Sequence, residues 1–162
     1  MSCYRTVGTA WRQFAAEHGE AWETAVARWL EDYGVHQLPD RYRWLVTEVI
    51  LRLPEGWSSH CSCTIRMAGE GEVVREHYAE ARLSSDADET CWRQAWEVVL
   101  NAAALNELTD AAIRGCIAHE LAHVGSALLP TPEKYNLHEN RADNIAKWWG
   151  FEEDLKVLGV VW

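Results

Sequence analysis

Two short runs of residues in the last third of the sequence could together hold a metal ion. The first is His119-Glu120-Leu121-Ala122-His123, and the second is Glu139-Asn140-Arg141-Ala142-Asp143. Residues four apart lie on one face of a helix, so the first run would present two imidazoles to one tetrahedral zinc ion. Glu120, beside them, could act as a general base toward a water molecule. The two runs therefore predict one zinc site.

The first run requires a helix, which we expect over residues 109–129. Thr109 or Asp110 can cap its first turn, and the prolines at 130 and 132 can end it. An apolar stripe at helical spacing is expected to face the core, with both histidines and Cys116 on the opposite side. The stripe consists of Ile113, Ile117, Leu121, Val124 and Leu128. This division predicts an amphipathic helix.

The second run is expected on another helix, with Asn136 as its N-cap and Gly150 at its end. Glu139 and Asp143 share a face with two alanines, which would let the helices approach closely. Asn136 followed by Glu139 also fits a capping box, in which the carboxylate needs no metal. Asp143 could equally be a solvated surface charge. From the residues alone, these alternatives stay open.

The combined pattern His119-Glu120-x-x-His123 and Glu139-x-x-x-Asp143 resembles the gluzincin clan of zinc metallopeptidases. The resemblance implies a zincin-like α+β fold in which His119, His123 and Glu139 bind one zinc ion. It also implies that Glu120 is the general base and that Asp143 accepts a hydrogen bond from the other ring nitrogen of His119. Zinc would lower the pKa of a bound water, which would attack the carbonyl of a peptide or protein substrate.

The chain departs from that clan at one point. Gluzincins commonly place a His or Tyr after the second motif to stabilise the oxyanion, and no His or Tyr follows Asp143 here. Tyr135, His138 and Arg141 are the nearest substitutes, unless they are ordinary loop or surface residues. Two rival functions therefore remain. One is a catalytically weak or inactive zinc-binding module that regulates or binds another protein, and the other is a metal-free helical interaction protein with a tryptophan surface.

Size and charge limit the class of protein. A chain of 162 residues suits a single domain over 1–162. The formal net charge of −10 disfavours a nucleic-acid or anionic-membrane surface, so neither partner is expected. No signal-like start and no long apolar run is present, which predicts a cytoplasmic protein. The five cysteines lack the spacing of a disulfide framework and are expected to stay thiols.

The part of the chain before the two runs predicts a helical cap over 1–54 and a small sheet over 55–108, with the metal-binding helices in 109–162. Apolar residues recur at helical spacing over 9–33, with a break near Gly19, and again over 40–53. We expect the cap to complete the core, and partner binding or self-inhibition is the alternative. Most of the ten tryptophans are expected in the core.

Three stretches are expected to form a small mixed sheet beside the helix of 109–129. Residues 59–67 should form a strand ending in a hairpin-like loop, with an antiparallel return strand near 77–83. Cys61 and Cys63 are read as strand residues, because no second cysteine pair completes a zinc site. The β-rich stretch 96–100 could pair, as an edge strand, with an extended peptide substrate. An ordinary strand, or a helix starting near Cys91, is the alternative.

Overall fold

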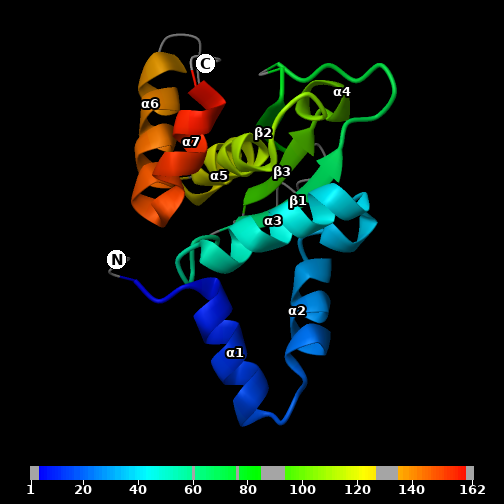
Figure 1. Cartoon of the computed structure of the whole chain (residues 1–162), viewed down its shortest axis with the longest axis vertical. Helices are drawn as coiled ribbons and strands as arrows, with labels where there is room; N and C mark the ends of the chain where they lie inside the picture. Colours follow the sequence, from blue (N-terminus) through cyan, green and yellow to red (C-terminus); the bar gives the residue numbers. More distant parts are fainter. Residues whose placement is uncertain (1–3, 60, 76, 85–93, 127–134, 160–162) are drawn as a thin grey trace.

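The computed structural model describes residues 4–59, 61–75, 77–84, 94–126 and 135–159 of the chain. Helices surround a small mixed sheet, so the predicted α+β class is confirmed (Figure 1). Among the described residues, none of the helices has the length and apolar character needed to span a membrane. The elements in chain order are α1 Val7–Glu17, α2 Trp22–Glu31, the short helix η1 Val35–Gln37, α3 Asp40–Arg52, β1 Cys61–Met67, β2 Ala79–Leu83, β3 Gln94–Leu100, α4 Ala102–Leu105, α5 Asp110–Ser126, α6 Tyr135–Ala146, the π-helical turn η2 Lys147–Phe151 and α7 Glu152–Leu158.

Helix α5 is the central element of the fold. It lies between the sheet and α3 on one side and α6 and α7 on the other (Figure 1). Every residue from Gly115 to Val124 is buried, so the predicted division into an apolar and a polar face is wrong. The hydroxyl of Thr109 accepts a hydrogen bond from the backbone N–H of Ala112 at 3.2 Å, which makes Thr109 the predicted cap. Leu128, Leu129, Pro130 and Pro132 lie outside the described residues.

The sheet has the strand order β1-β3-β2. Strand β1 pairs parallel to β3, with Cys63 opposite Trp96, and β2 pairs antiparallel to β3, with Ala81 opposite Val98. The predicted hairpin between the first two strands is therefore wrong, because β3 lies between them. The prediction that 96–100 could be an edge strand is also wrong. Val98, Val99 and Leu100 are all fully buried, as is typical of a central strand covered on both faces. The alternative of an ordinary strand is confirmed, and a helix over 96–100 is excluded, because Gln94–Leu100 forms β3; Cys91 itself lies outside the described residues.

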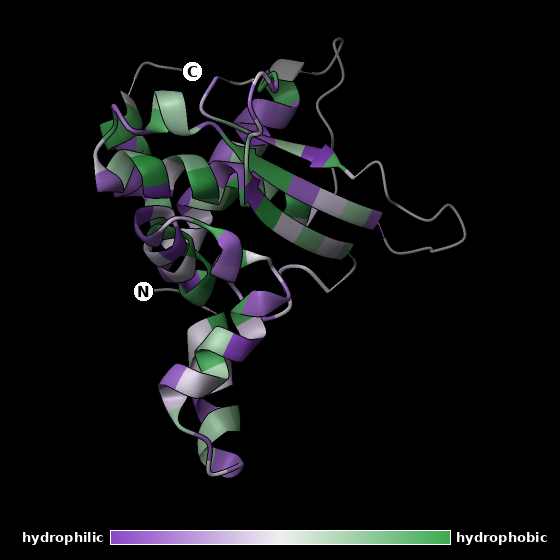
Figure 2. Cartoon of the chain, turned by 90° about the vertical axis from the view of Figure 1, so that its right-hand side faces the viewer, coloured by the Kyte–Doolittle hydropathy of each residue, from purple (hydrophilic) through white to green (hydrophobic). Residues whose placement is uncertain are grey.

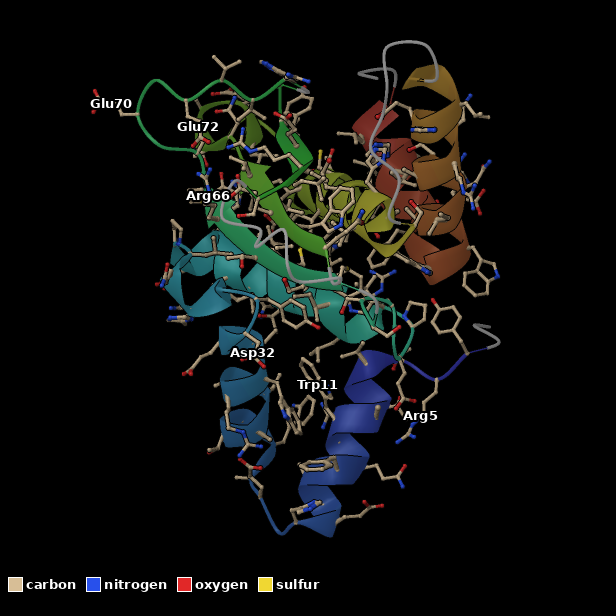
Figure 3. The ribbon with its side chains drawn as sticks, turned by 180° about the vertical axis from the view of Figure 1, so that it is seen from behind. Arg5, Trp11, Asp32, Arg66, Glu70 and Glu72 are labelled. Carbon is tan, nitrogen blue, oxygen red and sulfur yellow. The ribbon has the colours of Figure 1, made fainter. Side chains whose placement is uncertain are left out.

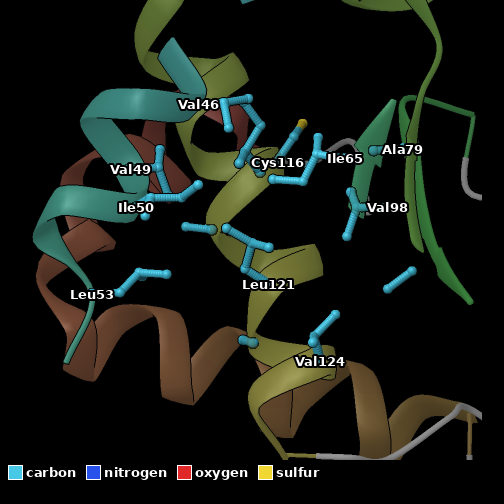
Figure 4. Packing of buried hydrophobic residues seen from close by; sticks show 14 of the residues in the cluster. Val46, Val49, Ile50, Leu53, Ile65, Ala79, Val98, Cys116, Leu121 and Val124 are labelled. Atoms are coloured by element: carbon cyan, nitrogen blue, oxygen red, sulfur yellow. The ribbon is translucent and has the colours of Figure 1, made fainter. Parts of the chain in front are cut away.

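The two faces of the sheet differ sharply in character. One face packs through Ile65 and Val98 toward Leu121 of α5, behind which lie Val49 and Ile50 of α3 (Figure 4). Cys61 and Cys63 are buried on β1, as predicted for strand residues, and with Cys116 they are thiols that are not joined in a disulfide. The opposite face carries an ion-pair network that joins β1, β2 and β3 to the loop after β1 (Figure 3). Its members are Arg66, Glu72, Arg82 and Glu97.

The N-terminal helices only partly complete the core. Helices α1 and α2 are separated at Gly19, which has a positive φ of 64°, as the predicted break requires. They form a hairpin that projects away from the sheet and α5 (Figures 1 and 2). Helix α3, in contrast, packs on α5 through the apolar residues that recur at helical spacing over 40–53, and this face is completely buried. That face consists of Tyr42, Leu45, Val46, Val49, Ile50 and Leu53.

The tryptophans are less buried than predicted. Of those in the described residues, only Trp57, Trp96 and Trp149 are buried. The three in the projecting hairpin are half-buried, because a two-helix hairpin can bury one side of each ring only. The side chains of Trp44 and Trp148 are 62% and 63% exposed.

Helices α6 and α7 are joined by a tight turn that brings both onto α5. Helix α6 already includes Tyr135, so Asn136 lies within its first turn rather than at the predicted N-cap position. The helix passes into η2, where Gly150 has a φ of 92°, and this residue ends it as predicted. The short helix that follows, α7, packs so closely on α5 that a side chain at Gly115 would meet the backbone of Asp154.

This close approach predicts that Gly115→Ala destabilises the protein. A Cβ at Gly115 would lie 2.9 Å from the backbone oxygen of Asp154, which cannot move as a side chain could. Alanine gains about 1 kcal/mol in helix propensity over glycine, but overpacking costs about 1–3 kcal/mol. We therefore expect a net loss in the free energy of unfolding, measured by urea titration. Gly69→Ala, where the nearest atom would be a carboxylate oxygen at 3.6 Å, is the control and should cost nothing.

Candidate metal centre

The two histidines of α5 lie side by side in the buried half of that helix. Their side chains are 1% exposed for His119 and 4% for His123. Their Nε2 atoms are 3.2 Å apart, as expected for imidazoles one helical turn apart that turn toward the same point. Two ring nitrogens at this distance require a proton or a cation between them. The predicted pairing of these histidines is therefore present in the fold.

Glu139 reaches the same point from α6. Ala142 and Ala146, both almost completely buried, form the contact face of α6 and let it approach α5, as predicted. The Glu139 Oε2 atom lies 2.8 Å from His119 Nε2. Its Oε1 atom lies 3.1 Å from His123 Nε2 but without the angles of a hydrogen bond. The carboxylate therefore contacts the histidines, and the side chain of Asn136, the partner in the alternative capping box, lies outside the described residues.

The donor set and its spacing fit a zinc ion. Zinc–nitrogen bonds of about 2.0–2.1 Å at tetrahedral angles place two ligand nitrogens roughly 3.3 Å apart. The distances of 2.8–3.2 Å between the donor atoms are within about half an ångström of this spacing. Glu139 Oε1 and His123 Nδ1 are buried without a hydrogen-bond partner in the described part of the chain. A buried oxygen of this kind is costly unless a donor or a cation satisfies it.

Asp143 supports His119 from behind. Its Oδ1 atom is 2.7 Å from His119 Nδ1, so the contact predicted for the second motif is present. Burial lowers the pKa of His119, but hydrogen bonds to Asp143 and Glu139 outweigh it and raise the pKa to about 10. Burial raises the pKa of Glu139, and its contacts with the two histidines lower it to about 2. Without metal, the cluster thus holds a charged imidazolium between two carboxylates, and a divalent cation would replace that proton.

Glu120 is buried beside the histidines and faces β2. Its side chain is 1% exposed, and its Oε2 atom accepts a hydrogen bond from the backbone N–H of Ala81 at 2.8 Å. Its Oε1 atom has no partner among the described residues. Burial raises the pKa of Glu120 to about 7, although the nearby charges of His119 and His123 lower it. A carboxylate with this pKa can both take and return a proton at neutral pH.

Of the three oxyanion candidates, Arg141 is the one whose position relative to the cluster follows from the described residues. Arg141 is exposed on the outer face of α6, where it lines a shallow pocket with Leu137 and Trp148, and α6 separates it from the histidines. Arg141 lies there because a step of two residues from Glu139 turns a side chain to the far side of a helix. His138 is half-buried directly before Glu139. The side chain of Tyr135 lies outside the described residues.

Sequence reasoning missed the contact between Glu120 and Ala81. No residue type at position 81 could have indicated it, because the donor is a backbone amide on a strand distant in sequence. The alternation of residue types over 77–83 was the one usable signal, because it indicates a β-strand, whose outward backbone groups can form hydrogen bonds.

Comparisons with known proteins give no relative for this chain: no family model matches it, and no curated protein or solved structure is significantly similar to it. The resemblance to the gluzincin clan therefore depends on the two motifs alone.

Proposed function

We propose that this protein is a zinc-dependent metallopeptidase of the gluzincin type, with one zinc ion held by His119, His123 and Glu139. The observation that carries the proposal is the convergence of these three side chains, whose ligand atoms all lie within 4.8 Å of one another. Three protein ligands leave one tetrahedral position for water or substrate, which distinguishes catalytic from structural zinc sites. A peptide or protein is the substrate of this proposal, and its place is the cytoplasm, where the buried thiols would stay reduced.

The mechanism assigns one role to each residue. His119, His123 and Glu139 would hold the zinc ion, which would supply a Lewis acid for the attacking water and for the substrate carbonyl. Glu120 takes the proton of the attacking water and returns it to the leaving amine. Asp143 holds the ring of His119 in the orientation and tautomer that direct its Nε2 atom to the metal. Burial of these side chains strengthens each electrostatic interaction.

The substrate strand of this proposal pairs with β2 and not with β3. Among the described strands β2 is the one at the edge of the sheet that faces α5, and its residue Ala81 contacts Glu120 directly. An extended peptide can pair with such an edge through backbone hydrogen bonds. Because Ala81 already donates its amide to Glu120 and Ala79 is fully buried, the groups left to pair are those of Leu83, which is 41% exposed.

A zinc-binding module without efficient catalysis is the second candidate. It is favoured by the placement of Arg141 away from the cluster and by the exposure of Trp44 and Trp148, which would suit a protein partner. Glu120 weighs against it, because a structural zinc site needs no buried base with a pKa near neutrality.

The experiment that separates these candidates begins with the metal content of the purified chain. We expect close to one zinc per chain by elemental analysis, and hydrolysis of an unstructured peptide library followed by mass spectrometry. Treatment with a chelator should abolish hydrolysis, and addition of zinc should restore it. Zinc without any hydrolysis would favour the module. A purified chain that contains no metal, that is as stable without zinc as with it and that hydrolyses no peptide when zinc is added would exclude both candidate functions.

A further inference from the structure

We infer that the backbone amide of Ala81 positions the general base, so that Oε2 of Glu120 is anchored and Oε1 is the oxygen that takes the proton. The inference extends the proposed function and depends on it. Ala81 itself touches no reacting atom and acts through Glu120.

The amide of Ala81 points out of the sheet because of the pairing register. In an antiparallel pair, successive residues alternate between bonding the neighbouring strand and pointing away from it. The backbone N–H of Asn101 donates to the carbonyl of Tyr78, and the N–H of Ser84 donates to the carbonyl of Ala95. The even-numbered residues from 78 to 84 are therefore the ones whose backbone groups point toward β3. Ala81, opposite Val98, is an odd-numbered residue. Its N–H therefore points away from β3, and it meets Glu120 there.

The two oxygens of Glu120 have different environments. Oε2 accepts the Ala81 amide at 2.8 Å, whereas Oε1 is buried and without a partner in the described part of the chain. A hydrogen bond between a backbone N–H and a carboxylate is among the stronger ones in proteins, so it limits rotation of the carboxylate. The unpartnered oxygen is then the one available to accept a proton from water.

Both ends of this contact belong to rigid elements. On the far face of the sheet, Arg82 pairs with Glu97 of β3 and with Glu72, which ties β2 in place one residue from the amide. Ala81 is only 6% exposed, and its small side chain lies against the core face, so no bulk separates strand from helix. A catalytic group held by rigid elements keeps the orientation that its reaction needs.

The alternative is that the contact merely ties α5 to β2 and has no effect on catalysis. Ala81→Pro distinguishes the two roles, because it removes the N–H, and proline is tolerated at outward-facing positions of edge strands. The matched control is the backbone amide of Ile65, which donates to the carbonyl of Tyr33 at 2.8 Å from β1, at the opposite edge of the sheet. At both positions an ester in place of the amide, made by semisynthesis, removes the donor without added bulk, and the ester at 81 replaces Ala81→Pro if that variant does not fold.

Two measurements follow on the full chain. With zinc bound, loss of the amide at 81 should lower kcat for peptide hydrolysis about 100-fold, the effect of a small misplacement of a reacting group, with KM changed no more than in the control. With Co²⁺ in place of zinc, the visible spectrum of the bound metal should shift, as we also expect for Glu120→Gln, and the change at 65 should leave the spectrum as in wild type.

The outcomes separate the inference from the proposed function. Wild-type kcat and an unshifted cobalt spectrum after loss of the amide at 81 would overturn the inference alone, as would an equal fall in kcat from the change at 65. Failure of the wild-type chain to bind zinc or Co²⁺, or to hydrolyse any peptide, would instead overturn the proposed function, and the inference with it.

Discussion

Glu120→Gln is expected to retain zinc and to lose about 10²–10⁴-fold in kcat, the usual contribution of a general base. Glutamine has the same shape as glutamate, and its side-chain oxygen can still accept the amide of Ala81, so the helix and the ligands stay in place. It cannot accept the proton of the attacking water. The measurement is steady-state hydrolysis of a peptide substrate, with zinc per chain determined on the same sample.

Two comparisons make this result specific. Glu107→Gln, at an exposed position between α4 and α5, should leave kcat unchanged. Equal turnover by Glu120→Gln and the wild type would remove Glu120 from the mechanism, and loss of zinc from this variant would show instead that the residue holds the metal.

The same substitution has a consequence for stability in the absence of metal. The pKa of Glu120 is raised by burial to about 7 from its ordinary value of 4.5, so the folded state binds the proton more tightly than the unfolded state does. The stability that Glu120 contributes is present at low pH and is lost as the pH rises from about 4.5 to 7. Above pH 7 the glutamine variant should therefore be at least as stable as the wild type.

His119→Ala is expected to abolish zinc retention, because it removes one ligand and separates Glu139 and Asp143 from the imidazole that joins them. Asp143→Ala leaves all three ligands in place and should weaken zinc affinity only about 10–100-fold, the usual effect of losing the partner behind a ligating histidine. Zinc affinity is measured by competition with a chelator of known affinity.

A second measurement checks that lost metal does not simply reflect lost folding. Zinc that binds the folded state alone raises the melting temperature in proportion to its affinity. This rise should be present in wild type, reduced in Asp143→Ala and absent in His119→Ala. His36→Ala, at an exposed histidine outside the cluster, should behave as wild type does. If Asp143→Ala lost zinc as completely as His119→Ala, Asp143 would be a zinc ligand itself, and not the residue that orients the ligand His119.

The sequence was sufficient for features that depend on neighbours along the chain. The turn of a helix places residues four apart on one face, so the pairing of His119 with His123 and of Glu139 with Asp143 follows from local geometry. The helix cap at Thr109 and the breaks at Gly19 and Gly150 follow from side-chain capping and from backbone conformations that glycine adopts easily.

Tertiary structure decided the order of the strands, the burial of the helices and the contacts between segments that are distant in sequence. Strand β3 takes the central position because its buried run can be covered on both faces, and this leaves β2 as the strand beside α5. Residues 115–124 of α5 are all buried, and α6 covers the histidines that the pattern assigned to an open face. The hydrogen bond between Glu120 and the amide of Ala81 joins residues 39 apart in sequence. Its donor is a backbone group, which every residue type except proline carries, so no residue pattern predicts it. Spacing along a helix is a property of the chain itself, whereas strand order and burial result from packing among distant segments.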